Sequence, residues 1–315
     1  MNSGSSSDEP GHAPVLRDEV IELIRPKPGG VYVDCTLGGA GHASAILEAA
    51  GSGATLIGLD RDPGAIERSG KRLARYGGGV ELHNCRFEDL KVPLAGRLAD
   101  GILIDLGVSS FMLDDAARGF SFQREGPLDM RMNPREGRTA ADIVNAAGER
   151  ELARIFREYG EERLAARIAR MIVRRRAEKP FETTLDLAQV AVAAYPKGRQ
   201  RIHPATRMFQ ALRIAVNGEL EHLEQALLDA VSALKPGGRL AVISFHSLED
   251  RIVKHTFARL ARGCICPPKT PVCICGHKAD AALLTRRPIT AGEAETDKNP
   301  RARSAMLRAV QREAA

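Results

Sequence analysis

The chain has few aromatic side chains. Among its 315 residues there is no Trp, and aromatic residues make up only 4% of the total. RNA-binding modules of the RRM and OB types stack bases on exposed aromatic rings. The composition therefore argues against a base-stacking platform. The net charge of +6 at pH 7 is compatible with an RNA partner without requiring one.

Long apolar runs and a cysteine-rich scaffold are also missing. No run approaches the roughly 18 apolar residues of a membrane-spanning helix. Residues 1–10 are polar and lack the basic and apolar regions of a signal peptide. Six cysteines are too few for a disulfide scaffold in a chain of this length. We therefore expect a cytoplasmic protein without a membrane segment, in which residues 1–11 form a disordered tail.

A glycine-rich segment at residues 31–42 is the most informative local pattern. Alternating β-formers lead to Asp34, a bend with three glycines follows, and helix formers continue to residue 50. The next apolar strand, 54–59, ends at Asp60, about twenty residues beyond the turn. Glycine lets a backbone approach a nucleotide closely, and an acid at this spacing can accept ribose hydroxyls. The pattern predicts a ribose-bearing cofactor, although a tight turn without a ligand also uses glycine.

Strands and helices alternate through the first third of the chain. Further strands are expected at 80–84 and 101–104, the second ending at Asp105. This alternation is typical of a doubly wound, mostly parallel sheet. Ligands bind such sheets beyond the carboxyl ends of the strands, where Asp34, Asp60 and Asp105 fall.

The alternation then stops for about a hundred residues. Residues 114–213 read as loops and helices, including one strongly periodic helix around 151–176, before a strand is predicted at 239–245. Two independent domains in series would leave that strand without a sheet. We therefore predict a discontinuous sheet domain, 12–113 and 214–315, that carries a helical insertion.

Several long motifs resemble one bacterial family. LKPGGRL at 234–240 is similar to the segment before a strand in class I S-adenosylmethionine methyltransferases. The other motifs resemble the 16S rRNA (cytosine-N4)-methyltransferase family RsmH, also called MraW. They are HAPVL at 12–16, DLGVSS at 105–110, RGFSF at 118–122, GPLDMRM at 126–132, YGEER at 159–163, HPATR at 203–207, ISFHSLEDR at 243–251 and NPRARS at 299–304.

This resemblance implies a fold, a reaction and a partner. The fold is an α/β, Rossmann-like class I methyltransferase with an inserted helical domain. The reaction is transfer of a methyl group from S-adenosylmethionine to N4 of a cytosine in the decoding region of 16S rRNA. The expected partner is the folded small ribosomal subunit. The sequence does not indicate an oligomeric state.

The resemblance also carries cofactor contacts onto this chain. They fall on Ala40, Gly41, His42, Asp60, Phe87, Asp105 and Met112. The family commonly has Gly at position 40 and Gln at position 112. A backbone contact at Ala40 is compatible with the side chain if φ is negative there. The change at Met112 removes a side-chain hydrogen bond.

Each candidate residue type suits a part of the chemistry. Asp60 can accept the ribose hydroxyls, and Phe87 can pack on the adenine or the ribose. The N4 amine is a poor nucleophile, because its lone pair conjugates with the ring, so an acceptor for its hydrogens is needed. Asp105 is the candidate for contact with the cofactor and for the catalytic base. His246 is a second catalytic candidate, with a structural histidine as the alternative.

The insertion carries an uneven distribution of charge. No acid occurs between Asp186 and Glu219, and the basic residues there include Lys197, Arg199, Arg201, Arg207 and Arg213. Residues 174–176 form a second arginine cluster. We expect Lys197, Arg199, Arg201 and Arg207 to contact RNA phosphates, with a solvated face as the alternative.

Two Cys-x-Cys pairs remain outside this scheme. Cys264 and Cys266 precede a proline-rich segment at 267–271, and Cys273 and Cys275 follow it. If that segment turns the chain back, four sulfurs converge near His277 as in a structural zinc site. The alternative is a set of reduced or redox-sensitive thiols.

Two other functions are compatible with parts of the sequence. A nicotinamide-dependent oxidoreductase could use the same glycine-rich turn. A non-catalytic RNA-binding or ribosome-assembly factor could retain the basic surface without turnover.

Overall fold

The chain folds into two compact units. The computed structural model describes residues 14–196, 198, 200, 202–267 and 272–314, so the tail predicted at 1–11 lies outside the described residues. The sheet unit comprises Met1–Gly107 and His222–Ala315, and the helical unit comprises Val108–Glu221. The helical unit thus starts earlier and ends later than the insertion predicted at 114–213.

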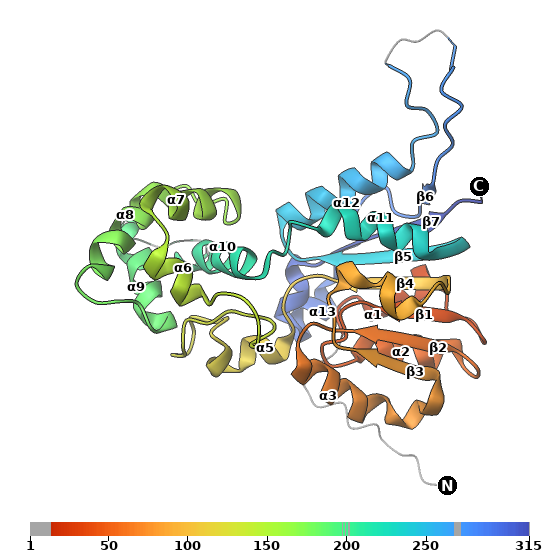
Figure 1. Cartoon of the computed structure of the whole chain (residues 1–315), viewed down its shortest axis with the longest axis horizontal. Coiled ribbons are helices and arrows are strands. Elements are labelled where there is room, and N and C mark those ends of the chain that lie inside the picture. Colours follow the sequence, from red (N-terminus) through yellow and green to blue (C-terminus); the bar gives the residue numbers. More distant parts are fainter. Residues whose placement is uncertain (1–13, 197, 199, 201, 268–271, 315) are drawn as a thin grey trace. The chain divides into compact units, whose positions relative to one another are not determined.

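The sheet unit is built on a seven-stranded, mostly parallel sheet (Figure 1). Its strand order is β3-β2-β1-β4-β5-β7-β6, and only β7 runs antiparallel to its neighbours. The strands are β1 (Val31–Asp34), β2 (Thr55–Leu59), β3 (Val80–His83), β4 (Ala99–Asp105), β5 (Leu234–Ser244), β6 (Ala281–Leu283) and β7 (Met306–Arg312). The strand predicted at 239–245 lies within β5, which pairs with β4, so both halves of the chain contribute to one sheet.

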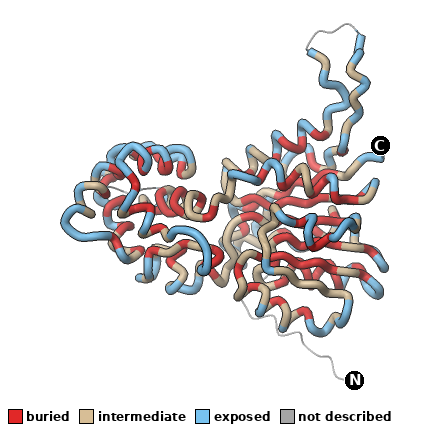
Figure 2. The backbone as a smooth tube through the Cα atoms, viewed as in Figure 1, coloured by how far each residue is buried: buried red, intermediate tan, exposed pale blue. Residues whose placement is uncertain are grey.

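Helices cover both faces of the sheet. The first face packs against α1 (Arg17–Ile24), α2 (Gly41–Ala50) and α3 (Pro63–Leu73), and the second against α11 (Leu223–Ala233) and α12 (Ser247–Leu260). Two short helices, α4 (Lys91–Leu94) and α13 (Glu293–Lys298), complete the unit. The strands are buried along most of their length (Figure 2). The predicted fold class is confirmed, and no helix in the described part of the chain could cross a membrane.

Strands β1 and β4 lie side by side at the point where the strand order reverses. From β1 the chain builds outward through β2 and β3, and from β4 it builds the other way through β5. In open α/β sheets, ligands bind beyond the carboxyl ends of the strands at such a switch point. Asp34 ends β1 and Asp105 ends β4, so the two acids flank this point.

The LKPGGRL segment differs from its predicted structure. Residues 235–238 were expected to separate helix from strand, but α11 ends at Ala233 and β5 begins at once. Ala99 pairs with Leu234 and Gly101 with Arg239, so residues 235–238 bulge opposite a single residue. That residue is Asp100, whose Oδ2 lies 2.6 Å from Lys235 Nζ. The ion pair fixes the bulge within the sheet.

The helical unit has a core of its own. Its helices are α5 (Ser110–Asp114), α6 (Ala140–Ala146), α7 (Glu149–Glu158), α8 (Ala165–Arg176), α9 (Thr184–Ala194) and α10 (Ala205–Asn217). Their buried faces form one cluster that includes Ile143, Phe156, Ile168, Leu187 and Leu212. This separate core is what an inserted domain requires.

The single helix predicted around 151–176 is wrong, because α7 and α8 are separate. Gly160 follows α7 in a tight space: a Cβ there would lie 2.5 Å from the carbonyl oxygen of Arg207. The next residue, Glu161, has a φ of +48°. Both helices bury apolar residues in the same core, which explains why the helical period continues across the break.

Two glycines of the helical unit offer a matched test of packing. Gly119 and Gly137 have φ values of +70° and +76°, but only a Cβ at Gly119 meets the backbone, at 2.1 Å from the Pro127 carbonyl oxygen. We expect Gly137→Ala to cost about 1 kcal/mol through its backbone conformation. Gly119→Ala should cost about 2–5 kcal/mol, because overlap adds to that strain. Urea unfolding of both variants measures this, and equal costs would contradict it.

Candidate functional site

The glycine-rich turn between β1 and α2 holds an unusual backbone conformation. Gly38 and Ala40 have φ values of +52° and +59°. The negative φ that would make a backbone contact at Ala40 compatible with its side chain is therefore not adopted. A non-glycine residue in the left-handed region is strained by about 1–2 kcal/mol. The glycine that the family commonly has at this position fits that conformation, and here a fully buried Ala40 adopts it.

Asp60 connects this turn to the end of β2. Its Oδ2 accepts a hydrogen bond from the Gly38 amide at 2.8 Å, and its Oδ1 accepts one from the Asp62 amide at 2.8 Å. Burial raises the pKa of Asp60 to about 6, although these amides favour the charged form. At neutral pH the group is a carboxylate, and each oxygen keeps a lone pair for a further donor such as a ribose hydroxyl.

Asp34 supports the turn from below. Its Oδ1 accepts a hydrogen bond from the Thr36 amide at 3.1 Å, and the Ala43 amide also donates to the carboxylate. Burial raises the pKa of Asp34 to about 7, and the nearby charge of Asp60 adds to the rise. These contacts hold the turn, which gives Asp34 a structural role.

Asp105 and His42 lie close together beside the turn. His42 Nε2 is 3.9 Å from Asp105 Oδ2, while Asp105 Oδ1 has no hydrogen-bond partner among the described residues. Burial, Asp34 and Glu249 raise the pKa of Asp105 well above its usual range. Burial and the charge of Arg17 lower the pKa of His42 to about 4, so its imidazole is neutral at pH 7. An unpartnered carboxyl oxygen of high proton affinity can take a hydrogen from a ligand.

A threonine that the sequence analysis missed links the two strands of the switch point. Thr36 Oγ1 accepts a hydrogen bond from the Asp105 amide at 2.7 Å, which joins the end of β4 to the turn after β1. Its only signal in the sequence is its place between Asp34 and the glycines.

Phe87 lies after β3, at the same end of the sheet. It opens a short 3₁₀ helix (Phe87–Asp89) and is half-buried. Asn84, in the connection before it, donates from Nδ2 to the backbone carbonyl of Asp60 at 2.8 Å. The segment that carries the aromatic ring is thereby attached to the residue proposed to hold the ribose.

Met112 and His246 have structural contacts of their own. Met112 lies in α5 of the helical unit and is buried in that unit's core. His246 is the N-cap of α12, where it forms a capping box with Glu249. Its Nε2 lies 3.0 Å from Glu249 Oε1, and Glu249 Oε2 accepts the Phe245 amide at 2.8 Å. The predicted roles of Met112 in cofactor binding and of His246 in catalysis stay predictions.

Some basic residues of the helical unit have hydrogen-bond or ion-pair partners, and others lie outside the described residues. Lys197, Arg199 and Arg201 lie outside the described residues. Arg207 Nη1 donates to the Glu161 carbonyl at 3.2 Å. Arg213 binds Glu219 through two contacts of 3.0 and 2.8 Å. In the second cluster, Arg175 pairs with Asp186 at 2.8 Å and Arg176 donates to the Val144 carbonyl at 2.6 Å.

The four cysteines of the two Cys-x-Cys pairs lie in the loop between α12 and β6. Because α12 returns along the sheet from the carboxyl end of β5, this loop follows the far end of the helix. It is therefore separate from the turn, Asp60 and Asp105 (Figure 1).

Comparison with known proteins gives a consistent result along the chain. The sequence profile of the MraW methylase family matches residues 9–313. A methylase family is incompatible with the nicotinamide-dependent oxidoreductase alternative. A solved structure of an rRNA methylase from Streptococcus thermophilus matches with a TM-score of 0.40 and 11% identity over 95% of this chain and 94% of that one. A likeness at this level carries no functional information.

Curated relatives are much more similar. A protein of Syntrophotalea carbinolica named Ribosomal RNA small subunit methyltransferase H is 56% identical over 96% of this chain and 98% of its own length. Proteins of the same name from Geobacter sulfurreducens and Heliobacterium modesticaldum are 54% and 51% identical, with the same coverage. Similarity at this level over nearly the whole length establishes the family. This chain belongs to the MraW methylase family.

Proposed function

We propose that this protein transfers the methyl group of S-adenosylmethionine to N4 of a cytosine in the decoding region of 16S rRNA, on the small ribosomal subunit. Methylation of small-subunit rRNA is supported by family membership along the chain and by relatives of that name at 51–56% identity. The single structural observation that carries the chemistry is the position of the Asp105 carboxyl, which ends β4 beside the turn and has a side chain that is 26% exposed.

The residues that follow the carboxyl ends of β1, β2 and β3 fit this cofactor. Asp60 has lone pairs left for the two ribose hydroxyls after accepting the Gly38 and Asp62 amides. Phe87, half-buried and partly open, offers an apolar surface for the adenine. The backbone at residues 40–42 opens helix α2 without a side-chain cap. When bound, the cofactor supplies a methyl group on a positively charged sulfur.

Asp105 then acts on the amine of the substrate. The N4 lone pair is delocalised into the cytosine ring, so the nitrogen gains nucleophilic character when an acceptor draws on its hydrogens. The Asp105 carboxyl, in its ionised form, is the acceptor and takes up the proton that leaves N4. His42 stays neutral beside it and adds no competing positive charge.

The helical unit supplies contacts to the RNA backbone. Lys197, Arg199, Arg201 and Arg207 occur in a stretch without acids, and we propose that they bind phosphates. Phosphate contacts fix the register of a nucleic acid, whereas base contacts specify its sequence. With few aromatic residues for stacking, the enzyme recognises the folded subunit by its shape.

Methyl transfer can be measured on small subunits from a strain that lacks this modification. With radiolabelled cofactor, we expect label on a decoding-region cytidine, and N4-methylcytidine after nuclease digestion and mass spectrometry. Asp105→Asn should lower kcat by about 10²–10⁴-fold, as loss of a general base does. Label that is absent, or present on C5, would refute the proposal. Subunit binding without transfer by the wild-type protein would support the non-catalytic assembly factor.

Cofactor affinity should depend on pH through Asp60. Its pKa of about 6 means that the carboxyl gains a proton as the pH falls, and a protonated group loses an acceptor for the ribose. Affinity for S-adenosylhomocysteine should therefore fall about fourfold from pH 7.5 to 5.5. Calorimetry should show weaker, pH-independent binding for Asp60→Asn. Asp34→Asn is the control, because Asp34 also titrates, near pH 7, but only supports the turn.

A pair of substitutions at His246 distinguishes capping from catalysis. His246→Ala removes the N-cap of α12 and should cost about 1 kcal/mol of stability. His246→Asn can still accept the Glu249 amide and should remain close to wild type. Both variants should keep the wild-type kcat when measured well below their unfolding temperatures. A large loss of kcat in the folded Asn variant would instead assign His246 to catalysis.

A further inference from the structure

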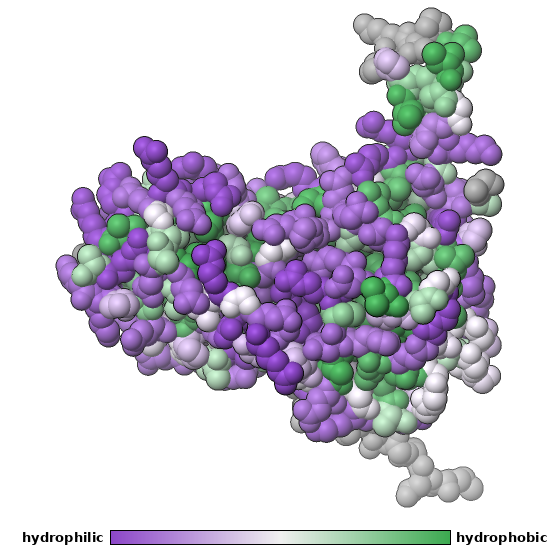
Figure 3. Space-filling view, viewed as in Figure 1, coloured by the Kyte–Doolittle hydropathy of each residue, from purple (hydrophilic) through white to green (hydrophobic). Residues whose placement is uncertain are grey.

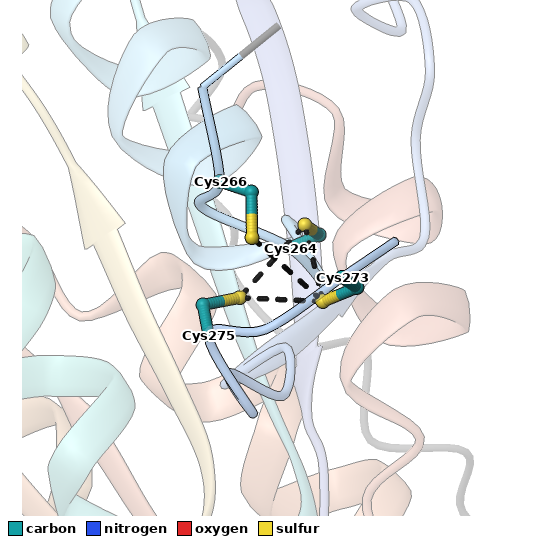
Figure 4. Close-up of side chains that lie close together, drawn as sticks. All are labelled: Cys264, Cys266, Cys273 and Cys275. Carbon is teal, nitrogen blue, oxygen red and sulfur yellow. Dashed lines mark hydrogen bonds between the residues drawn. The ribbon is translucent and has the colours of Figure 1, made fainter. Parts of the chain in front are cut away.

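The loop between α12 and β6 brings four sulfur atoms together. Sγ of Cys273 lies 3.5 Å from those of Cys264 and Cys275 and 3.9 Å from that of Cys266, and Cys275 lies 3.8 Å from Cys264. Figure 4 shows the four side chains pointing toward a common centre from two segments of the loop. The four sulfurs therefore lie together, as they would if the segment between the pairs turned the chain back. The proline-rich turn between them lies mostly outside the described residues.

The distances match metal binding and not disulfides. A disulfide would place two sulfurs about 2.05 Å apart, and all four cysteines are free. Four thiolates about 2.3 Å from one tetrahedral zinc ion lie about 3.8 Å from each other. The measured separations, 3.5 to 3.9 Å, cluster around that value.

Apolar packing does not account for this arrangement. Ile265, Val272 and Ile274 are 63%, 72% and 84% exposed, although they alternate with the cysteines. Figure 3 shows apolar surface on this projecting loop. Cysteine and isoleucine are both usually buried. Here the thiols face one another and the larger apolar side chains face solvent. A cross-link through the sulfur atoms would therefore stabilise the loop where apolar packing does not.

Backbone amides also point at two of the sulfurs. The amides of Ile265 and His277 donate to the sulfur of Cys275, and the Cys266 amide donates to that of Cys264. Four thiolates at these separations require a cation between them. His277 contributes its amide, and the four cysteines alone form the ligand group.

We propose that Cys264, Cys266, Cys273 and Cys275 bind one zinc ion. Four sulfur ligands fill a tetrahedral site, so no position is open for a substrate and the ion is structural. The site fixes the loop that connects α12 to the edge strand β6. It is separate from Asp60 and Asp105, so its measurement does not depend on methyl transfer.

Metal content of the untagged, full-length protein tests the proposal. Plasma mass spectrometry should find one zinc ion per chain. The double variant Cys266→Ser/Cys275→Ser keeps one cysteine of each pair and should lose the metal. Mutation of residues that only hydrogen-bond to metal ligands already lowers metal affinity by about 10–100-fold, and this variant removes two ligands. Cys85→Ser is the matched control, because it removes a thiol outside the loop and should keep the full zinc content.

Cobalt gives a second readout that does not depend on a variant. Replacing zinc with cobalt should produce the sulfur-to-cobalt charge-transfer bands and the intense visible bands of a tetrahedral thiolate site. Three results for the wild-type protein would overturn the proposal. They are the absence of bound metal, the absence of the cobalt bands, and the presence of two disulfides in a thiol titration under denaturing conditions. Stoichiometric iron in place of zinc would overturn the assignment of the metal. Zinc retained by the double variant would overturn the assignment of the ligands.

Discussion

The burial of three carboxyl groups at neighbouring strand ends is the constraint on which the site depends. Asp34, Asp60 and Asp105 all have raised pKa values, and burial is the largest cause in each case. For Asp34, a rise from 3.8 to about 7 corresponds to about 4 kcal/mol. The folded-state pKa lies above the unfolded one, so this cost is absent below pH 4, grows between about pH 4 and 7 and is complete above that.

This cost explains why the turn has its particular shape. Each carboxylate needs donors, and the backbone amides of Thr36, Gly38 and Asp62 supply them. Two of these amides lie in the turn, whose backbone enters the left-handed region at Gly38 and Ala40. Asp105 is the exception, because its Oδ1 is left without a partner. A ligand with hydroxyl donors and a positive charge would reduce the remaining free-energy cost of burying these carboxylates. Strain of this kind is typical of functional sites.

The sequence predicted the parts of the fold that depend on local patterns. Strands β1, β2 and β4 are apolar runs that end at or just before an acid, and the alternation of strands with helices predicted a mostly parallel sheet. Strand β7 was missed because Arg308 interrupts its apolar run. That arginine is buried and neutralised by Asp250, at 2.7 and 3.1 Å, a partner 58 residues away. No local pattern reveals such a pair, and β6 is too short to give a signal of its own.

The same limit applies to the candidate site. Acids at strand ends could be predicted, since strand ends follow from periodicity. The positive φ of Ala40 and the hydrogen bond from the Asp105 amide to Thr36 could not, because both depend on how β1 and β4 meet. The glycine at position 160, where the helix breaks, has a similar origin. A Cβ there would meet the carbonyl oxygen of Arg207, which lies in another helix. Tertiary contacts decided each of these positions.

The structure also shows that some arginines of the helical unit are already paired with carboxylates. Arg213 and Arg175 look available for RNA in the sequence, yet Glu219 and Asp186 hold them at 2.8 Å. An arginine held by a carboxylate does not neutralise a phosphate, so it displaces no counterion from the RNA and adds little to salt-dependent affinity. This pairing removes two of the arginines of the helical unit from the basic residues that we propose to bind phosphates. With a small number of phosphate contacts, the logarithm of the binding constant would fall only slowly with the logarithm of the salt concentration, with a slope of about 0.7 per phosphate for a single strand. Recognition would then depend on the shape of the subunit.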